Sequence, residues 1–413
     1  GDDMAGDGTR AAPWATIQHG VNTVLGTPTI PAILHVAAGH YHEAIEMDPW
    51  ESLEGGWNSD FTQRWDFERI GAAPPVEFES IIDGDSSARC ISIVDAENVS
   101  INGFTVQNGN MPSGAGVYSD SSGVAIANCI FRNNTASSEG GAIDDDGASL
   151  ISNCRFEGNT SRLGGAISTG NSTLIVQCIF EGNEAEFGGG IFGDHFDYVL
   201  TGSEFSQNVA YRGGGIFNVE ASPRIENCIF RNNTFNSDFT GTYVGGGGIL
   251  NETASPEIIN CTFVNNSAGL YGGGLYNNYG SSPVVKNCIF WGNSAASSGD
   301  QISNDDSSAT ISFSNIQGSG GSGGAWDGSF GVDAGGNIDA DPLFVDPVGI
   351  DGQSGTFDDN LHLSFDSPCI NTGTEVDANF NDMGACPAVT VGVARDFNSI
   401  DAALNNISSF EQR

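Results

Sequence analysis

Short apolar runs separated by glycine, asparagine and serine recur along most of the chain, with three types of run in each repeat. One run ends three residues before a cysteine-rich column. The next contains the cysteine and a phenylalanine two residues later, and the last follows a glycine cluster. Residues two apart point to the same side of a strand, so the cysteine and the phenylalanine share one face. β-Branched runs bounded by glycine and asparagine are typical of strands, and no long helical spacing interrupts them.

The runs recur with a nearly constant period. The second run starts, in successive repeats, at Cys129, Cys154, Cys178, Ser203, Cys228, Cys261 and Cys288. The steps between these positions are 25, 24, 25, 25, 33 and 27 residues, a period that is typical of a solenoid. Three strands in each repeat of this length predict an all-β fold, a right-handed parallel β-helix with caps at both ends. Adjacent coils would lie about 4.8 Å apart, so identical residues stack on one another.

Each column of the repeat then has a structural task. The phenylalanine and isoleucine columns fill the interior through apolar burial. An asparagine column forms a side-chain amide ladder and supplies the left-handed backbone of a bend. Its members are Asn134, Asn159, Asn183, Asn208, Asn233, Asn266 and Asn293. Glycine clusters, such as residues 188–190 and 213–215, allow a sharp corner where no Cβ fits.

The organisation along the chain follows from where the period starts, breaks and ends. We expect an N-terminal cap over residues 1–30, with a short helix over 16–25. The β-helix follows over 31–317, then C-terminal coils and a cap over 318–387, and a cap-like or linker segment over 388–413. An excursion over 48–82 and a loop over 234–244 are expected to project from the coils. Caps are expected because open coil ends are sheet edges that invite pairing.

Three sets of motifs resemble those of known families. The repeats carry Phe-x-x-Asn followed by Gly-Gly-Ala-Ile, at Phe131–Asn134 with Gly140–Ile143, and again at Phe156–Asn159 with Gly164–Ile167. They resemble polymorphic outer-membrane proteins and other bacterial surface β-helices of the pectin-lyase-like superfamily. The C-terminal motifs are similar to the closing region of anchored secreted β-helix proteins: Asn337–Phe344, Leu361–Leu363, Ser367–Asn371 and Asp382–Ala385. The opening motifs Ala15–Gln18 and Val36–Tyr41 are similar to the first coil of the same group.

This resemblance implies the fold and an exported surface protein, secreted or held at the cell surface. It does not select an activity, because one fold hosts many functions. The net charge is −39 with 13 basic residues, which argues against nucleic acid and anionic membrane surfaces as partners. The sequence also contains no apolar run long enough to span a membrane.

Six of the nine cysteines occupy the interior column, where they are expected to be small buried hydrophobic residues. Serine replaces cysteine at Ser203 and Ser314, which argues against obligatory pairing. A Cys369–Cys386 disulfide closing the C-terminal cap is a hypothesis that their closeness in sequence prompts.

Candidate chemistry is sparse. A lyase needs a base and a cation that neutralises a uronate carboxylate, and Lys286 with Arg224 could supply them. Stacked carboxylates are the other candidate. Asp120 and Asp146 fall on adjacent coils of a column that also holds Asp194, Glu252 and Asp305. With Asp144 and Asp145, they suit a solvated acidic face, a calcium site or a glycosidase pair.

Aromatic residues form two further candidate surfaces. Phe192, Phe217, Leu250 and Tyr276, with Tyr118 further up, follow the glycine-flanked column and could face a sugar or a partner, or form a satellite core. Trp50, Trp57 and Trp65 in the excursion face the same choice. His40 and His42 share one face of a strand, which favours an exposed or packed pair over a zinc site.

The function expected from these features is that of an exported, non-enzymatic structural or adhesive protein. It would act at the cell surface or in the extracellular matrix, and end-to-end contact between copies could form a fibre. No cofactor is expected with certainty, although calcium fits the acidic column. The alternatives are a polysaccharide lyase or glycoside hydrolase, and a passive module that binds surface glycans.

Overall fold

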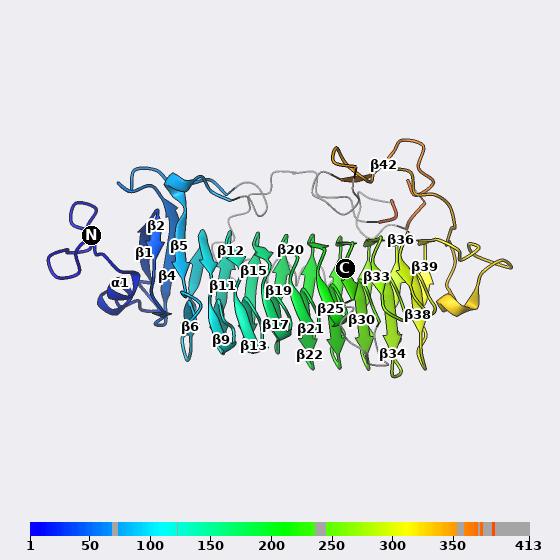
Figure 1. The fold of residues 1–413 in the computed structure, drawn as a ribbon, viewed down its shortest axis with the longest axis horizontal. Helices are drawn as coiled ribbons and strands as arrows, with labels where there is room; N and C mark the ends of the chain where they lie inside the picture. The colour runs from blue at the N-terminus through cyan, green and yellow to red at the C-terminus, as the bar shows by residue number, and fades with distance from the viewer. Residues whose placement is uncertain are drawn as a thin grey trace.

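The chain winds into an elongated parallel β-helix, with a small N-terminal helix at one end (Figure 1). The structure, a computed structural model, describes residues 1–67, 73–121, 123–235, 245–352, 359–370, 372–374 and 382–384. Each regular coil contributes one strand to each of four parallel sheets, which we number in chain order within a coil. This architecture is the right-handed parallel β-helix that the sequence predicts.

Sheets 1 and 2 form two long faces of the rod. Sheet 1 contains β1 (Ala32–Ala37), β4 (Glu51–Trp57), β7 (Ser100–Asn102), β11 (Val124–Ala127), β15 (Ser149–Ser152), β19 (Leu174–Val176), β23 (Val199–Thr201), β27 (Arg224–Glu226), β31 (Glu257–Ile259), β35 (Val284–Lys286), β39 (Thr310–Ser312) and β41 (Val332–Asp333). Sheet 2 contains β2 (Gly39–Tyr41), β5 (Ser80–Asp83), β8 (Phe104–Gln107), β12 (Ile130–Arg132), β16 (Arg155–Glu157), β20 (Ile179–Glu181), β24 (Glu204–Ser206), β28 (Ile229–Arg231), β32 (Thr262–Val264), β36 (Ile289–Trp291) and β40 (Asn315–Ile316).

Sheets 3 and 4 complete each coil. Sheet 3 contains β9 (Asn110–Ser113), β13 (Thr135–Glu139), β17 (Thr160–Leu163), β21 (Glu184–Phe187), β25 (Val209–Arg212), β29 (Thr234–Phe235), β33 (Ser267–Ala268) and β37 (Ser294–Ala295). Sheet 4 contains β3 (Ile45–Glu46), β6 (Ile91–Ile93), β10 (Val117–Ser119), β14 (Ile143–Asp145), β18 (Ile167–Thr169), β22 (Ile191–Asp194), β26 (Ile216–Val219), β30 (Ile249–Glu252), β34 (Leu275–Asn278) and β38 (Ile302–Asn304). Sheet 3 was not expected, so the prediction of three strands in each coil was incomplete.

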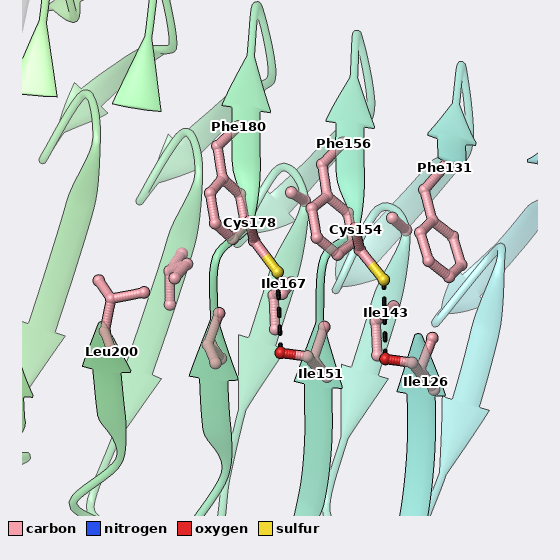
Figure 2. Packing of buried hydrophobic residues seen from close by; sticks show 14 of the residues in the cluster. Ile126, Phe131, Ile143, Ile151, Cys154, Phe156, Ile167, Cys178, Phe180 and Leu200 are labelled. Carbon is pink, nitrogen blue, oxygen red and sulfur yellow. Dashed lines mark hydrogen bonds between the residues drawn. The ribbon is translucent and has the colours of Figure 1, made fainter. Parts of the chain in front are cut away.

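Stacked side chains fill the interior. Seven phenylalanines from Phe131 to Phe290 lie in register on sheet 2, with successive ring centroids 4.4–5.1 Å apart and ring planes within 13° of parallel. Figure 2 shows three of these rings beside the isoleucine columns. The column cysteines are buried with free thiols, and Cys154 Sγ donates to the backbone oxygen of Ile126 in the preceding coil at 3.6 Å. Burial of these columns supplies the main favourable term of the fold.

The asparagine column forms the expected ladder, and every member is at least 95% buried. Asn159 Nδ2 donates to Asn183 Oδ1 at 3.0 Å, and the same oxygen accepts the backbone N–H of Asn159. The expectation that these asparagines take the left-handed backbone is wrong. Positive φ falls on the preceding residue instead, for example at 55° on Asn133. The ladder residue therefore keeps an ordinary backbone while its side chain points inward.

A glycine in the left-handed region begins the corner between sheets 3 and 4. Gly213 has φ +67°, and a Cβ there would lie 2.2 Å from the backbone oxygen of Ile216. A larger residue would therefore combine backbone strain with a steric clash. The corner brings Leu163 and Phe187, which end β17 and β21, against the outer face of sheet 4, where Phe187 stacks on Phe217.

The N-terminal end is closed by helix α1 (Ile17–Thr23), as expected. Thr16 caps this helix through its hydroxyl, and Ile17 and Val21 are buried in the main core. The excursion expected over 48–82 is shorter than predicted, because β4 and β5 occupy its two ends as regular strands. Between these two strands, residues 58–67 and 73–79, which include the 3-10 helix η1 (Val76–Phe78), lie outside the parallel sheets. The second projecting loop, expected over 234–244, lies almost entirely outside the described residues.

The other end is closed by a loop rather than by further complete coils. Trp326 and Phe330, the last residue of the 3-10 helix η2 (Gly328–Phe330), pack against the main core. The chain then turns back, so that the antiparallel pair β42 (Phe344–Asp346) and β43 (Asn360–Leu363) lies over the outer face of sheet 2 (Figure 1). Cys369 is a buried free thiol in this segment, whereas Cys386 and the cap-like segment 388–413 lie outside the described residues. The Cys369–Cys386 disulfide therefore has no support in the structure.

Candidate functional site

The four aspartates expected to hold calcium do not converge on one point. Asp144 and Asp145 are consecutive strand residues and so point to opposite sides of sheet 4. Asp120 and Asp146 are exposed, and Asp120 accepts the backbone N–H of Asp95 instead of facing Asp146. Among the described residues, they do not form a cluster of three or more metal-ligating atoms. The acidic column is therefore a set of separately bonded carboxylates, and the expected calcium site is not assembled.

Asp144 is the most perturbed carboxylate of this set. It is 4% exposed, and burial raises its pKa to about 7, with the nearby charges of Asp146 and Glu139 adding to the increase. The Arg89 guanidinium lies 4.8 Å from the ring centroid of Tyr118, whose strand pairs with that of Asp144. A carboxyl that keeps its proton near neutral pH can act as a general acid, so this position is chemically competent but poorly accessible.

Asp145 has a structural role. It is fully buried, and burial raises the pKa of its carboxyl to about 6. Its two oxygens accept hydrogen bonds from Ser149 Oγ at 2.7 Å and from Thr173 Oγ1 at 2.5 Å. These bonds join two coils and leave this carboxylate committed to the fold.

The two cations of the expected lyase site are not brought together. Arg224 is paired with Glu226 on its own strand and with Glu257 on the next. Lys286 is half-buried, two coils from Glu226, with Ile259 between them in the sheet register. Arg224 is therefore neutralised by carboxylates instead of being available to a uronate, so the geometry does not favour a lyase site here.

The aromatic row on sheet 4 is a satellite core. Phe192, Phe217, Leu250 and Tyr276 are 0–6% exposed and form one cluster. Phe187 and Tyr271 from the sheet 3 side pack over this row. Because these side chains are covered by their own protein, the row offers no open face to a sugar or a partner.

A cavity of about 610 Å³ lies at the N-terminal end and is lined by residues from the stretch 7–17, from α1 and from β1. Its aromatic walls come from Trp14, Tyr41, Trp57 and Phe61, and its polar lining includes Asp7, Arg10 and His35. The Trp57 ring stacks on His35 with centroids 4.5 Å apart. The indole Nε1 of Trp57 is buried without a hydrogen-bond acceptor among the described residues.

This cavity includes one of the three tryptophans singled out in the sequence. Trp57 lines it, whereas Trp50 and Trp65 do not. The ring centroid of Trp65 instead lies 6.0 Å from that of Phe78 within the excursion. Trp50 is a half-buried turn residue with φ 66°. Sequence analysis did not single out Trp14 and Tyr41 as binding residues, although Trp14 directly precedes one of the two motifs that resemble the opening coil of surface β-helix proteins and Tyr41 ends the other.

Comparisons with known proteins address the fold. Residues 78–235 match the family model described as a right handed beta helix region. No curated protein matches the chain. Among solved structures, the chain is similar to the crystal structure of pectate lyase Pel9A, with 14% identity over 94% of each chain and a TM-score of 0.48. It is also similar to the tailspike protein of the E. coli bacteriophage HK620 in complex with a pentasaccharide, with 12% identity over 74% of this chain and 60% of that chain, and a TM-score of 0.26.

The family match and the sheet topology agree that this is a right-handed parallel β-helix protein. Likenesses at this level of identity and TM-score say nothing of activity, and the finer resemblance to outer-membrane and anchored proteins stays a prediction. No helix in the described part of the chain is long and apolar enough to cross a membrane.

Proposed function

We propose that this chain is an exported adhesive rod that binds a glycan in the cavity at its N-terminal end. The observation that carries the proposal is the aromatic cavity of about 610 Å³ formed by Trp14, Tyr41, Trp57 and Phe61. Its volume falls within the range of about 300–1,000 Å³ that is usual for small-molecule sites. The net charge of −39 favours solubility and repels non-specific contacts, which suits a protein at a surface.

The lining of the cavity suits a sugar. Aromatic side chains supply large apolar faces with a polar edge, so they can pack against the C–H face of a pyranose ring. Asp7, Arg10 and His35 supply polar groups for the hydroxyls. Because the chain has 52 acidic and 13 basic residues, a neutral glycan fits better than a polyanionic one.

Copies that meet end to end would meet through the described caps. α1 covers the first coil, and Trp326 and Phe330 cover the last one. Fibre formation through cap surfaces remains part of the proposal, and electron microscopy of the purified chain tests it, since strict monomers contradict it.

The glycan proposal is tested by a glycan array, followed by calorimetry with the best glycan. We expect Trp14→Ala and Trp57→Ala each to weaken binding at least ten-fold. Tyr279→Ala removes an aromatic ring that is 55% exposed and distant in sequence, and it should leave affinity unchanged. Circular dichroism confirms that each variant is folded. No binding on the array, or binding that persists in both tryptophan variants, would refute the proposal.

A second candidate function is hydrolysis of a polysaccharide at Asp144. The observation that favours it is the pKa of about 7, which keeps this carboxyl protonated as a general acid would require. A reducing-sugar assay over a substrate panel tests it, with Asp144→Asn expected to abolish activity and Asp120→Asn as the control. We rank this candidate second because Asp144 is only 4% exposed.

A further inference from the structure

Two histidines from the first coil meet an aspartate from the second. His40 lies in β2 and His42 follows this strand directly, while Asp83 ends β5. The parallel register pairs Tyr41 with Ile82, which places His42 beside Asp83. The two imidazole centroids are 4.1 Å apart, and one ligating atom from each of the three side chains lies within 4.8 Å of the others. Among the described residues, this is the group of histidine, cysteine and carboxylate side chains close enough to share a metal ion.

The aspartate is held in place from a third coil. Asp83 is 4% exposed, and its oxygens accept hydrogen bonds from Gln107 Nε2 at 2.7 Å and from Asn108 Nδ2 at 3.0 and 3.1 Å. The backbone N–H of Asp85 donates to it at 2.9 Å. A buried carboxylate fixed in this way is already oriented toward His40, because His40 Nε2 lies 2.7 Å from Asp83 Oδ2.

A second carboxylate orients one of the imidazoles. Asp85 Oδ1 lies 2.7 Å from Nδ1 of His42. When Nδ1 donates to Asp85, the lone pair of the imidazole is on Nε2. A ligating histidine whose other ring nitrogen binds a carboxylate is the usual arrangement around protein-bound zinc. The cluster therefore supplies both the ligands and the groups that fix their orientation.

We propose that His40, His42 and Asp83 bind one divalent transition-metal ion, Zn²⁺ by preference, with a fourth position open to water. Two imidazoles and one carboxylate are a ligand set typical of zinc with an open position. Ligand atoms around tetrahedral zinc are roughly 3.3 Å apart, given bonds of about 2.0–2.1 Å. The side chains of His40 and His42 are 44% and 52% exposed, so an ion can reach them from solvent. The single carboxylate argues against Ca²⁺ and Mg²⁺, which need mainly oxygen ligands.

The site would fasten the first two coils together. His40 and Asp83 are 43 positions apart in the chain, and they belong to adjacent strands of sheet 2. An ion bound by both coils would therefore link the two coils nearest the N-terminal cavity, without lining that cavity. This inference does not depend on the proposed function.

The test is calorimetric titration of the chelator-treated chain with ZnCl₂, with excess Mg²⁺ present to occupy carboxylate-only sites. We expect one equivalent of Zn²⁺ to bind, and His40→Gln and His42→Gln each to weaken this binding by more than about 100-fold. Gln107→Leu, which removes a group that orients Asp83, should weaken it by about 10–100-fold. Co²⁺ titrated in place of Zn²⁺ should give visible absorption bands of a low-coordinate site, and His42→Gln should abolish them.

His195→Gln provides the matched control. His195 is 62% exposed and sits between Asp194 and Glu220, so it combines an imidazole with two carboxylates but has no second histidine. This variant should bind Zn²⁺ like the original chain. No binding, or binding that persists unchanged in His40→Gln and His42→Gln, would overturn the proposal.

Discussion

Removing one amide from the asparagine ladder should destabilise the coil around it. Asn134 is fully buried, and its Nδ2 donates to the backbone oxygen of Val106 and to Asn159 Oδ1, both at 3.0 Å. Its Oδ1 accepts the backbone N–H of Gly109 at 2.9 Å. In Asn134→Ala, the N–H of Gly109 and the carbonyl of Val106 lose this partner in a buried place. At about 1–3 kcal/mol for each such group, the free energy of unfolding should fall by about 2–6 kcal/mol.

The neighbouring residue is the control. Asn133 is exposed and has φ +55°, a conformation that glycine adopts without strain. Asn133→Gly should therefore change the free energy of unfolding by no more than about 0.5 kcal/mol. The two variants remove the same amide from adjacent positions and differ in whether it is bonded inside the rod.

Urea denaturation followed by circular dichroism measures the global effect. Hydrogen exchange measured by mass spectrometry shows which coils lose stability. The loss should be local, because the stability of a solenoid comes from contacts between neighbouring repeats. We expect faster exchange in residues 104–112 of Asn134→Ala, with peptides around residue 285 unchanged. Equal losses of stability in Asn133→Gly and Asn134→Ala would refute the ladder argument.

Three further predictions concern charge, thiols and corners. Because the pKa of Asp144 is raised from 3.8 to about 7, the folded state keeps a proton that the unfolded chain loses, and stability falls as pH rises between these values. Urea denaturation measures the free energy of unfolding of Asp144→Asn relative to the original chain, and this difference should favour the variant by up to about 4 kcal/mol more at pH 8 than at pH 4. A difference that does not change with pH contradicts this. The eight described thiols should stay unreactive toward a disulfide reagent in the native protein, and nine thiols should titrate after unfolding; a count of seven would restore the Cys369–Cys386 bridge. Gly213→Ala should lower the thermal midpoint of unfolding more than Gly182→Ala. Both glycines have positive φ, but only Gly213 has a backbone oxygen 2.2 Å from the new Cβ. Equal shifts of the midpoint would contradict the clash.

The columns of the sequence predict the interior well because each coil repeats the same local environment. Phe131, Phe156 and Phe180 stack in register as their 25- and 24-residue spacing indicates. Sheet 3 was not predicted because the buried position of each of its strands usually holds a small residue, alanine or serine. This residue lies between exposed ones, as Ala185 does between Glu184 and Glu186. A column two residues after the ladder asparagine was its signal: Ala136, Ser161, Ala185, Ala210 and Ala268.

The candidate sites were less accessible from the sequence, because they depend on contacts between unlike segments. Trp14 and Trp57 line one cavity although 43 positions separate them, and neither belongs to a repeated column. His40 and His42 were visible as a pair, but Asp83 joins them only through the register of β2 with β5. The aromatic row containing Phe192 was visible as well, yet its burial depends on Phe187 from another sheet.

The described residues after position 340 contact several coils on the outer face of sheet 2. Leu361 packs on Ile229 and Val264, and the backbone N–H of Gly384 donates to the backbone oxygen of Asn287. A solenoid without such contacts can fray one coil at a time from its end, because each repeat contacts only its neighbours. Here the coils that contain β28, β32 and β36 are all contacted by the same returning residues, so unfolding from this end must release several coils together. A force applied to the returning residues would therefore act on several coils at once before the last coil unfolds.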